Sequence, residues 1–191
     1  GWEGEIRGRN VMKRFIWRDI KESIDLLKDK EDKKTLKKLK EEYREVISNN
    51  NSVLGIANQK ECQKYNLRRK GAFIFIENDK EEILFKKEGS DYVSLFTELG
   101  LGESHEEAAY SLLATSTGSL SELKTVSKVA HTSKEENHIS IVLHGNHDQS
   151  LTFVNKETEF LPKNRVFEML EDENSGLGEG FALAFKQIYA K

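Results

Sequence analysis

The hydrophobic period of the chain changes near residue 50. Before that point, apolar residues recur every three or four positions through residues 10–48, which is the period of an α-helix. After it, two short runs rich in isoleucine and phenylalanine flank Asn78-Asp79, a dipeptide that readily forms a tight turn. This change predicts a helical N-terminal segment over residues 1–50, containing two helices, and a strand-containing domain over residues 51–191.

The second part of the chain mixes the two periods. Alternating runs predict β-hairpins at residues 70–88 and 138–155. Ser104 followed by Glu107 is a capping box that opens a helix. Further helices are expected at residues 91–99, 119–130, 166–170 and 181–189. Hairpins segregated from helices predict an α+β fold, an antiparallel sheet built from hairpins with helices packed on one face.

Composition excludes several classes of protein. The net charge of −3 and the pI near 6.0 give no overall attraction for nucleic acid. The single cysteine, Cys62, rules out an internal disulfide and a cysteine-rich zinc site. No apolar run approaches the length of about 20 residues that a membrane span needs, so no membrane contact is expected. Basic residues exceed acidic ones only in residues 1–50, which supports a boundary there.

The tetrapeptide Gly145-Asn146-His147-Asp148 resembles the metal-binding signature of the calcineurin-like phosphoesterases. Such a site needs two metals held by carboxylates and imidazoles from several loops. The other histidines lie outside any such pattern, so a hairpin turn is the better interpretation. Cys62 has no histidine nearby in sequence and is expected to be an inert thiol. The sequence therefore predicts no catalytic residue, no metal and no cofactor.

Four short segments, in the same order, resemble the cap-binding domain of polymerase basic protein two of influenza-type viruses. They are Ile83-Leu84-Phe85-Lys86, the helix opened by Ser104, the run Leu151–Lys156, and Leu161-Pro162. The resemblance implies a non-catalytic domain of a viral RNA polymerase, used in cap-snatching transcription. Its partners would be capped host mRNA and other polymerase subunits, in the host nucleus and the virion.

The resemblance also assigns positions around the methylated guanosine. In that family two aromatic rings sandwich the cationic base, and a carboxylate and a lysine contact its edge. Here a ring is missing at Thr115 and a carboxylate at Gly71. The implication is that cap binding is weak or lost. The side chains assigned to the site are Lys86, Tyr65, Arg68, Arg69, Asn164 and Thr115.

Two other interpretations stay open at this point. One is the cap-binding domain of a single-chain viral L polymerase, which would act in the cytoplasm. The other is an unrelated protein-interaction module, in which the Lys- and Glu-rich N-terminal helices bind a partner.

Overall fold

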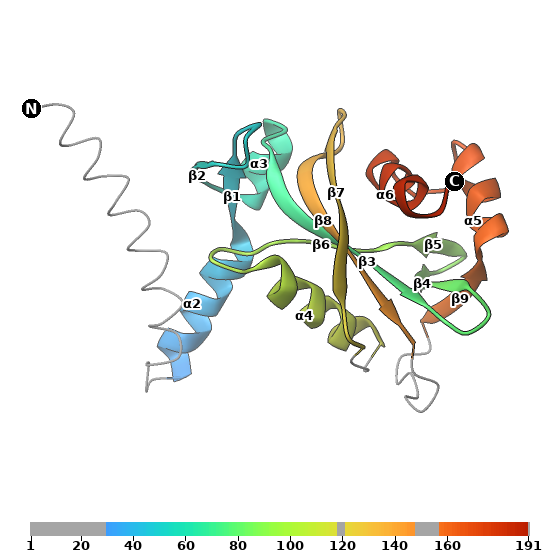
Figure 1. Ribbon diagram of the computed structural model, residues 1–191. Helices are drawn as coiled ribbons and strands as arrows, with labels where there is room; N and C mark the ends of the chain where they lie inside the picture. Colours follow the sequence, from blue (N-terminus) through green and yellow to red (C-terminus); the bar gives the residue numbers. More distant parts are fainter. Residues whose placement is uncertain (1–29, 118–120, 148–156, 191) are drawn as a thin grey trace, which may run out of the picture.

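The computed structural model describes residues 30–117, 121–147 and 157–190. The first of the two helices predicted within residues 10–48 lies outside these residues. None of the described helices is long and apolar enough to cross a membrane. The elements (Figure 1) are α2 Lys30–Glu42, β1 Tyr43–Ile47, β2 Val53–Asn58, α3 Gln59–Lys64, β3 Arg69–Glu77, β4 Glu82–Glu88, β5 Asp91–Val93, β6 Leu95–Glu98, α4 His105–Thr117, β7 Lys124–Thr132, β8 Asn137–Asn146, β9 Thr158–Pro162, α5 Lys163–Glu171 and α6 Glu179–Tyr189.

A mixed, mostly antiparallel sheet of seven strands forms the centre of the fold. Its order is β5-β4-β3-β8-β7, with β6 also paired to β3 and β9 to β4. Among the described pairs, β3 and β8 alone run parallel, from Arg69 opposite His138 to Glu77 opposite Asn146. A separate antiparallel sheet contains β1 and β2. The predicted α+β class with a helix near the N-terminus is therefore confirmed.

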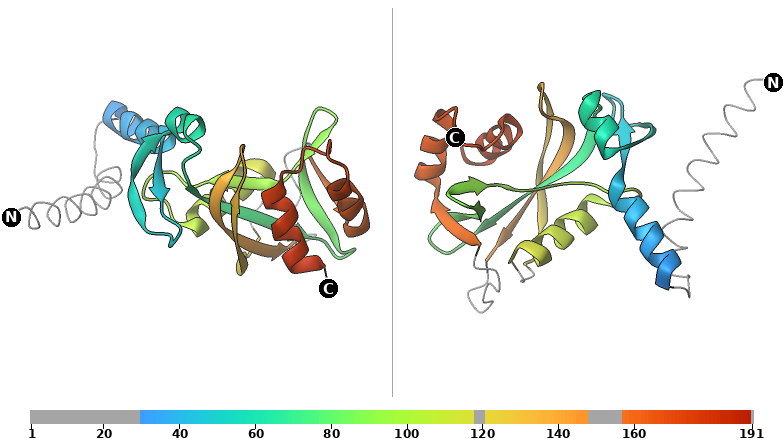
Figure 2. Two further views of the ribbon diagram at one scale, coloured as in Figure 1. Left: turned by 90° about the horizontal axis from the view of Figure 1, so that it is seen from above. Right: turned by 180° about the vertical axis from the view of Figure 1, so that it is seen from behind.

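The alternation of side chains along β3 decides which helix covers each face of the sheet. Phe73 and Phe75 point into one core, where the Phe75 ring lies 5.5 Å from the ring of Phe181 in α6. Ile74 points to the other face and packs with Leu113 of α4. Because successive strand residues face opposite ways, one buried strand supports two cores. Figure 2 shows α4 and α6 on opposite sides of the sheet, so helices cover both faces.

Helix signals in the sequence were largely correct. The amide of Glu107 donates to the hydroxyl of Ser104 over 3.1 Å, as the capping box predicts. The helices expected at residues 166–170 and 181–189 are α5 and α6. The second N-terminal helix is α2, but it ends at Glu42, and the residues up to Ile47 form strand β1. The predicted domain boundary near residue 50 stays a prediction. Strands β1 and β2, which lie on either side of that residue in the sequence, pair with each other.

Two predicted helices are strands. Where a helix was expected at residues 91–99, Asp91–Val93 and Leu95–Glu98 form β5 and β6, and where one was expected at residues 119–130, the described residues from Lys124 onward belong to β7. Both segments contain valine and threonine, and the first also contains Tyr92 and Phe96; these residue types favour strands when a neighbouring strand is available. The neighbours are remote in sequence, since β6 pairs with β3 and β7 with β8. Tertiary pairing therefore overrode the local helical pattern.

The two predicted hairpins are also arranged differently. β3 and β4 meet only at the turn, where Glu77 lies opposite Ile83, and then diverge to other partners. The strand β8 forms its hairpin with β7, through a turn at residues 133–136. Its expected partner, the run beginning at Leu151, lies outside the described residues.

Candidate functional site: an acidic cleft at the start of α6

A cavity of about 820 Å³ opens where three parts of the chain meet. An adjoining cavity of about 530 Å³ shares part of its wall, and together we call them the α6 cleft. Each volume lies within the range of about 300–1,000 Å³ that is typical of small-molecule sites. The larger cavity is lined by Val93, Ser94 and Phe96, by Ser133, Lys134, Glu135 and Glu136 of the β7–β8 turn, and by Gly176, Gly178 and Glu179.

Acidic side chains predominate around the α6 cleft. Glu135 and Glu179 line both cavities, and Asp172 and Glu173 line the smaller one. The basic side chain among these lining residues is Lys134. Carboxylates crowded at a concave surface focus a negative potential into it. The cleft is thus suited to a cation or to a donor of hydrogen bonds.

Glu136 is the fixed carboxylate of the cleft. Its Oε2 atom accepts a hydrogen bond of 3.2 Å from the amide of Gly180, in the first turn of α6. Its oxygens also lie 3.6 Å from His131 Nε2 and 3.8 Å from His138 Nε2. The neighbouring His138 imidazole lowers the pKa of Glu136, and the Gly180 amide adds to this effect against the opposing effect of burial. Glu136 is therefore an ionised group held in one place.

Glycines make this approach possible. A Cβ atom on Gly178 would lie 2.9 Å from Glu136 Oε1, and one on Gly180 would lie 3.0 Å from the ring of His138. Both distances are tighter than ordinary van der Waals contact, so a side chain at either position would displace the carboxylate or the ring. The sequence pattern Gly178-Glu179-Gly180 was the available signal for this site. Sequence reasoning missed the site because the partner residues lie some 40 positions earlier.

The two histidines behind Glu136 connect it to the core. His138 is buried, its Nδ1 lies 2.7 Å from the hydroxyl of Ser140, and its ring packs 5.1 Å from Phe96. His131 Nε2 lies 3.1 Å from a carboxylate oxygen of Glu179. The chain Ser140–His138–Glu136 has the residue types of a hydrolytic triad. Ser140 is fully buried, however, so its hydroxyl does not face the cleft.

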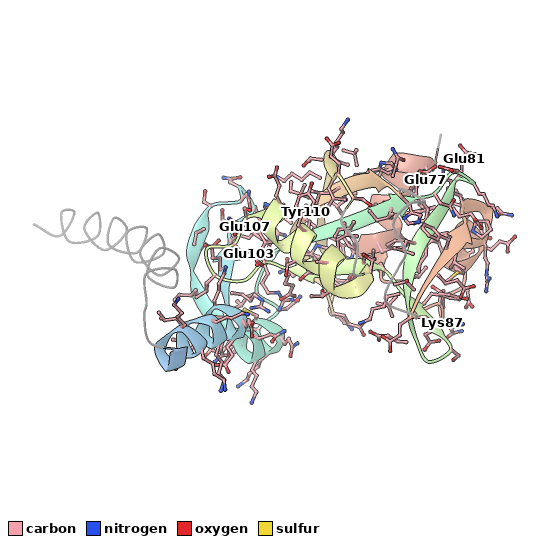
Figure 3. All side chains as sticks on the ribbon, turned by 90° about the horizontal axis from the view of Figure 1, so that it is seen from below. Glu77, Glu81, Lys87, Glu103, Glu107 and Tyr110 are labelled. Carbon is pink, nitrogen blue, oxygen red and sulfur yellow. The ribbon has the colours of Figure 1, made fainter. Side chains whose placement is uncertain are left out.

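A second polar cluster surrounds Glu77 at the end of β3 (Figure 3). Its carboxylate accepts a hydrogen bond of 2.7 Å from Lys163 and one of 3.2 Å from Tyr189, and lies 3.2 Å from His144. Burial alone would raise the pKa of Glu77, but the hydrogen bonds from Lys163 and His144 lower it. Burial and the Glu77 charge raise the pKa of Tyr189. This cluster ties the start of α5 and the end of α6 to the sheet, so we assign it a structural role.

The tetrapeptide beginning at Gly145 lies at the end of β8. Its Asp148 is outside the described residues, and the ring of His147 packs 5.4 Å from that of Phe160. Within the described part of the chain, no group of three or more His, Cys, Asp or Glu residues is placed to hold a metal ion. The expectation that His144, His147 and Asp148 bind no catalytic metal stays a prediction.

Three of the residues assigned to a cap site lie between α3 and the start of β3. Tyr65 is exposed at the end of α3, with the Lys64 ammonium 5.1 Å from its ring. Arg68 donates to the Asn137 side chain over 2.9 Å. Arg69 is buried, with Nε 3.2 Å from a carboxylate oxygen of Glu98. The described interactions of both arginines hold parts of the fold together. Because Arg69 is buried, it cannot form part of a basic rim around an open site.

The other three lie on separate elements. Lys86 pairs with Glu88 at 3.5 Å on β4. The hydroxyl of Thr115 donates back to the Ser111 carbonyl on the exposed side of α4, and Asn164 is exposed on α5. None of these six residues lines the α6 cleft.

Comparison with solved structures identifies the fold. The chain is similar to DR0079 from Deinococcus radiodurans, with a TM-score of 0.64 and 12% identity over 78% of this chain and 99% of that one. Weaker matches include the MutT protein from Methanosarcina mazei Go1 (TM-score 0.49, 17% identity, 63% and 91% covered) and the E. coli ORF135 protein (0.49, 14%, 64% and 89%). No protein-family model and no curated protein matches the chain.

These comparisons correct the resemblance drawn from sequence. The fold that matches is that of DR0079, not that of a viral cap-binding domain. The assignments to a viral polymerase, to cap snatching and to RNA binding are therefore wrong. The four matching segments were short apolar runs, a capping box and a Leu-Pro pair, which recur wherever strands and helices begin. Their order did not specify the parallel β3–β8 pair or the strands at residues 91–98.

Proposed function

We propose that this chain is a non-catalytic binding domain whose α6 cleft takes an organic cation. The ligand would carry an amine or guanidinium group on an apolar body. One observation supports this most directly, namely that the carboxylates of Glu135, Glu136 and Glu179 stand around a cavity whose wall includes Val93 and Phe96. The cationic group of the ligand would contact these carboxylates, and its apolar part would pack on the ring of Phe96.

The expected affinity is modest. An ion pair at an exposed carboxylate contributes about 0.2–1 kcal/mol, and Glu179 is 76% exposed. Burial of about 100 Å² of apolar ligand surface contributes about 2.5 kcal/mol. Glu136 adds more than an ordinary exposed carboxylate because the Gly180 amide holds it in position. We expect dissociation constants of about 0.1–1 mM, near −4 to −5.5 kcal/mol.

A third cavity, between α2, β6 and α4, is a poorer candidate. Its volume is about 380 Å³, and its three acidic side chains are matched by three basic ones. Figure 3 shows the acidic residues Glu103 and Glu107 at the start of α4. The Glu103 carboxylate accepts a hydrogen bond of 3.0 Å from the amide of Gly100. Balanced charges that already pair within the fold give a charged ligand less attraction than the α6 cleft does.

The arrangement of the cleft favours binding over metal-assisted hydrolysis. Such hydrolysis uses carboxylates that converge on a cation and activate water. Glu136 instead faces two imidazoles and the amide of Gly180. On α4, the exposed residues after the first turn are Ser111, Ala114 and Thr115, and none of them has a carboxylate that could hold a metal ion.

Calorimetric titration with 2-phenylethylamine and its neutral analogue 2-phenylethanol tests the proposal. The amine should bind at about 0.1–1 mM and the alcohol at least about fivefold more weakly, because the alcohol lacks the charge. The double variant Glu135→Gln and Glu179→Gln should lose this difference. Glu42→Gln, a change at a half-exposed residue on α2, is the matched control and should keep it.

Two outcomes would overturn the proposal. Equal binding of amine and alcohol, or equal loss in the control variant, would show that the acidic rim does not select the ligand. Release of phosphate from phosphate anhydrides in the presence of Mg²⁺, abolished by Glu103→Gln, would show that the domain is catalytic and acts elsewhere.

A further inference from the structure

His131 lies between two carboxylates that come from different parts of the chain. Its ring projects from β7, and its Nε2 atom is 3.6 Å from an oxygen of Glu136 in the β7–β8 turn. The same nitrogen is 3.1 Å from an oxygen of Glu179, the first residue of α6. The side chain of His131 is 10% exposed, and within the described part of the chain this nitrogen makes no aligned hydrogen bond. His131 therefore touches both the turn and the helix without being bonded to either.

The charge on His131 determines whether these contacts attract or repel. A neutral imidazole has either one proton or one lone pair at Nε2, so it can satisfy one carboxylate at most. The two negative charges beside it then repel each other. A protonated ring carries a positive charge and a donor at Nε2, so it attracts both carboxylates. Protonation would thus convert this contact from a repulsive one into an attractive one.

Other charged groups reach His131 from the β7–β8 turn. Glu136 stays ionised from pH 5.5 upward, because the neighbouring His138 imidazole holds its pKa below the ordinary carboxyl value. Lys134 and Glu135 line the same cavity and have opposite charges. The turn therefore presents a net negative charge to His131 when the imidazoles are neutral.

A second histidine lies next to His131 on the neighbouring strand. His138 is opposite His131 in the β7–β8 pairing, and their ring centres are 6.3 Å apart. On β3, the residue opposite His138 is Arg69, whose guanidinium pairs with Glu98. Among the described ion pairs, His131 joins both cleft carboxylates, whereas His138 joins Glu136 alone. We therefore assign the proton-dependent contact with α6 to His131.

The start of α6 is the part of the helix that this contact can hold. Towards the other end, Gln187 accepts a hydrogen bond from the hydroxyl of Ser127 on β7, and the Tyr189 hydroxyl is bonded to β3. At the start, the hydrogen bond that joins α6 to the turn in the described structure runs from the Gly180 amide to Glu136, over 3.2 Å. An attraction between Glu136 and α6 through His131 would strengthen this one link.

We infer that His131 acts as a pH-operated clasp, which in its protonated form holds Glu136 and Glu179 together and closes the start of α6 onto the β7–β8 turn. Imidazole changes its charge between about pH 5 and 8, so the clasp would close as the pH falls through this range. Closure would also occupy two carboxylates of the α6 cleft. A cationic ligand and the proton on His131 would then compete, and each would weaken the binding of the other. This second part rests on the proposed function, whereas the clasp itself does not.

Amide hydrogen exchange in the ligand-free protein tests the clasp. The exchange rate of the Gly180 amide, divided by that of an unstructured peptide at the same pH, measures how often the start of α6 leaves the turn. Protection should be at least about threefold greater at pH 5.5 than at pH 8. The amide of Ala190, bonded to the Lys186 carbonyl at the other end of α6, is the internal control and should show no such difference.

Two variants remove the clasp from opposite sides. His131→Gln and Glu179→Gln should each abolish the pH dependence of Gly180 protection. Glu179 is 76% exposed, so its replacement leaves the packing of the fold intact. His105→Gln is the matched control, because His105 lies at the start of α4, on the other side of the sheet, and this variant should keep the dependence.

Calorimetric titration with 2-phenylethylamine tests the regulation of the cleft. The amine carries its charge at both pH values. Its binding should be at least about threefold weaker at pH 5.5 than at pH 8, because the protonated imidazole competes for the carboxylates. This ratio should fall to about one in His131→Gln and persist in His105→Gln.

The two measurements separate the clasp from the proposed function. Equal protection of Gly180 at both pH values, or a difference that survives in His131→Gln, would overturn the clasp. Binding of the amine with the same affinity at both pH values would refute the regulation. Absence of amine binding at either pH, together with Gly180 protection that depends on His131, would support the clasp and refute the proposed function.

Discussion

A methyl group added at Gly71 should destabilise the fold and disturb the α6 cleft together. Gly71 lies in β3, opposite Ser140 of β8 and Glu98 of β6. A Cβ atom there would collide with the Ser140 hydroxyl and would lie 2.6 Å from Cε2 and 2.8 Å from Cζ of Phe96. Phe96 has little room to move, because its ring packs 4.6 Å from Phe73 and 5.1 Å from His138.

The magnitude follows from two opposing effects. Overpacking a filled core costs about 1–3 kcal/mol. Replacing glycine by alanine restricts the unfolded chain and returns about 0.4–1 kcal/mol. We therefore expect Gly71→Ala to lower the free energy of unfolding by about 1–2 kcal/mol. With a denaturant slope of about 2 kcal/mol/M, the urea midpoint should fall by about 0.5–1 M.

Urea unfolding followed by circular dichroism measures this shift. Gly55→Ala is the matched control, since a Cβ atom at Gly55, also in a strand, would meet nothing within 4 Å. An unchanged midpoint for Gly71→Ala would show that Phe96 yields easily and that the packing argument is wrong. Binding of 2-phenylethylamine should also weaken in Gly71→Ala, because Phe96 lines the cleft.

Three further predictions concern ionisable groups. Because the folded state lowers the pKa of Glu136, its stabilising effect is present above the ordinary carboxyl pKa and is lost as the pH falls through the lowered value. Glu136→Gln should therefore flatten the acid side of the stability curve, and an unaltered curve would contradict this. The pKa of Tyr189 is raised above 10.0, so stability should fall as the pH rises beyond 10, less so in Tyr189→Phe, with alkaline unfolding as the measurement. Burial raises the pKa of the Cys62 thiol, so it should react with a thiol reagent only at the rate of unfolding, and rapid labelling of the native protein would refute its burial.

Local signals in the sequence predicted those parts of the fold that local physics determines. The Ser104 capping box and the period of α6 depend on neighbours within four residues, and both were correct. The strand at residues 124–132 was missed because its preference is decided by β8, which follows it in the chain. Similarity of short apolar segments suggested a viral domain because such segments specify helices and strands but not the way strands pair.

The candidate site could not be predicted from the sequence, for a related reason. Glu136 and Gly180 are 44 residues apart, and the hydrogen bond between them depends on where α6 begins above the β7–β8 turn. The glycine pattern at residues 176–180 was visible, but its partner was not. The six residues assigned to a cap site came from the resemblance alone, and the fold distributes them over α3, β3, β4, α4 and α5 or beside them.

The parallel pairing of β3 with β8 has a consequence for how quickly the protein reaches this fold. The two strands begin side by side although they are separated by 69 residues, the same interval that divides the hydrogen-bonded Arg68 and Asn137. Contacts of such long sequence separation slow folding, because the entropy of closing the loop is lost before the strands pair. During synthesis, β3 emerges long before its central partner and exposes an edge that includes Phe73 and Phe75. Refolding from urea should therefore be slow for a chain of this size and should pass through a species that binds hydrophobic dyes.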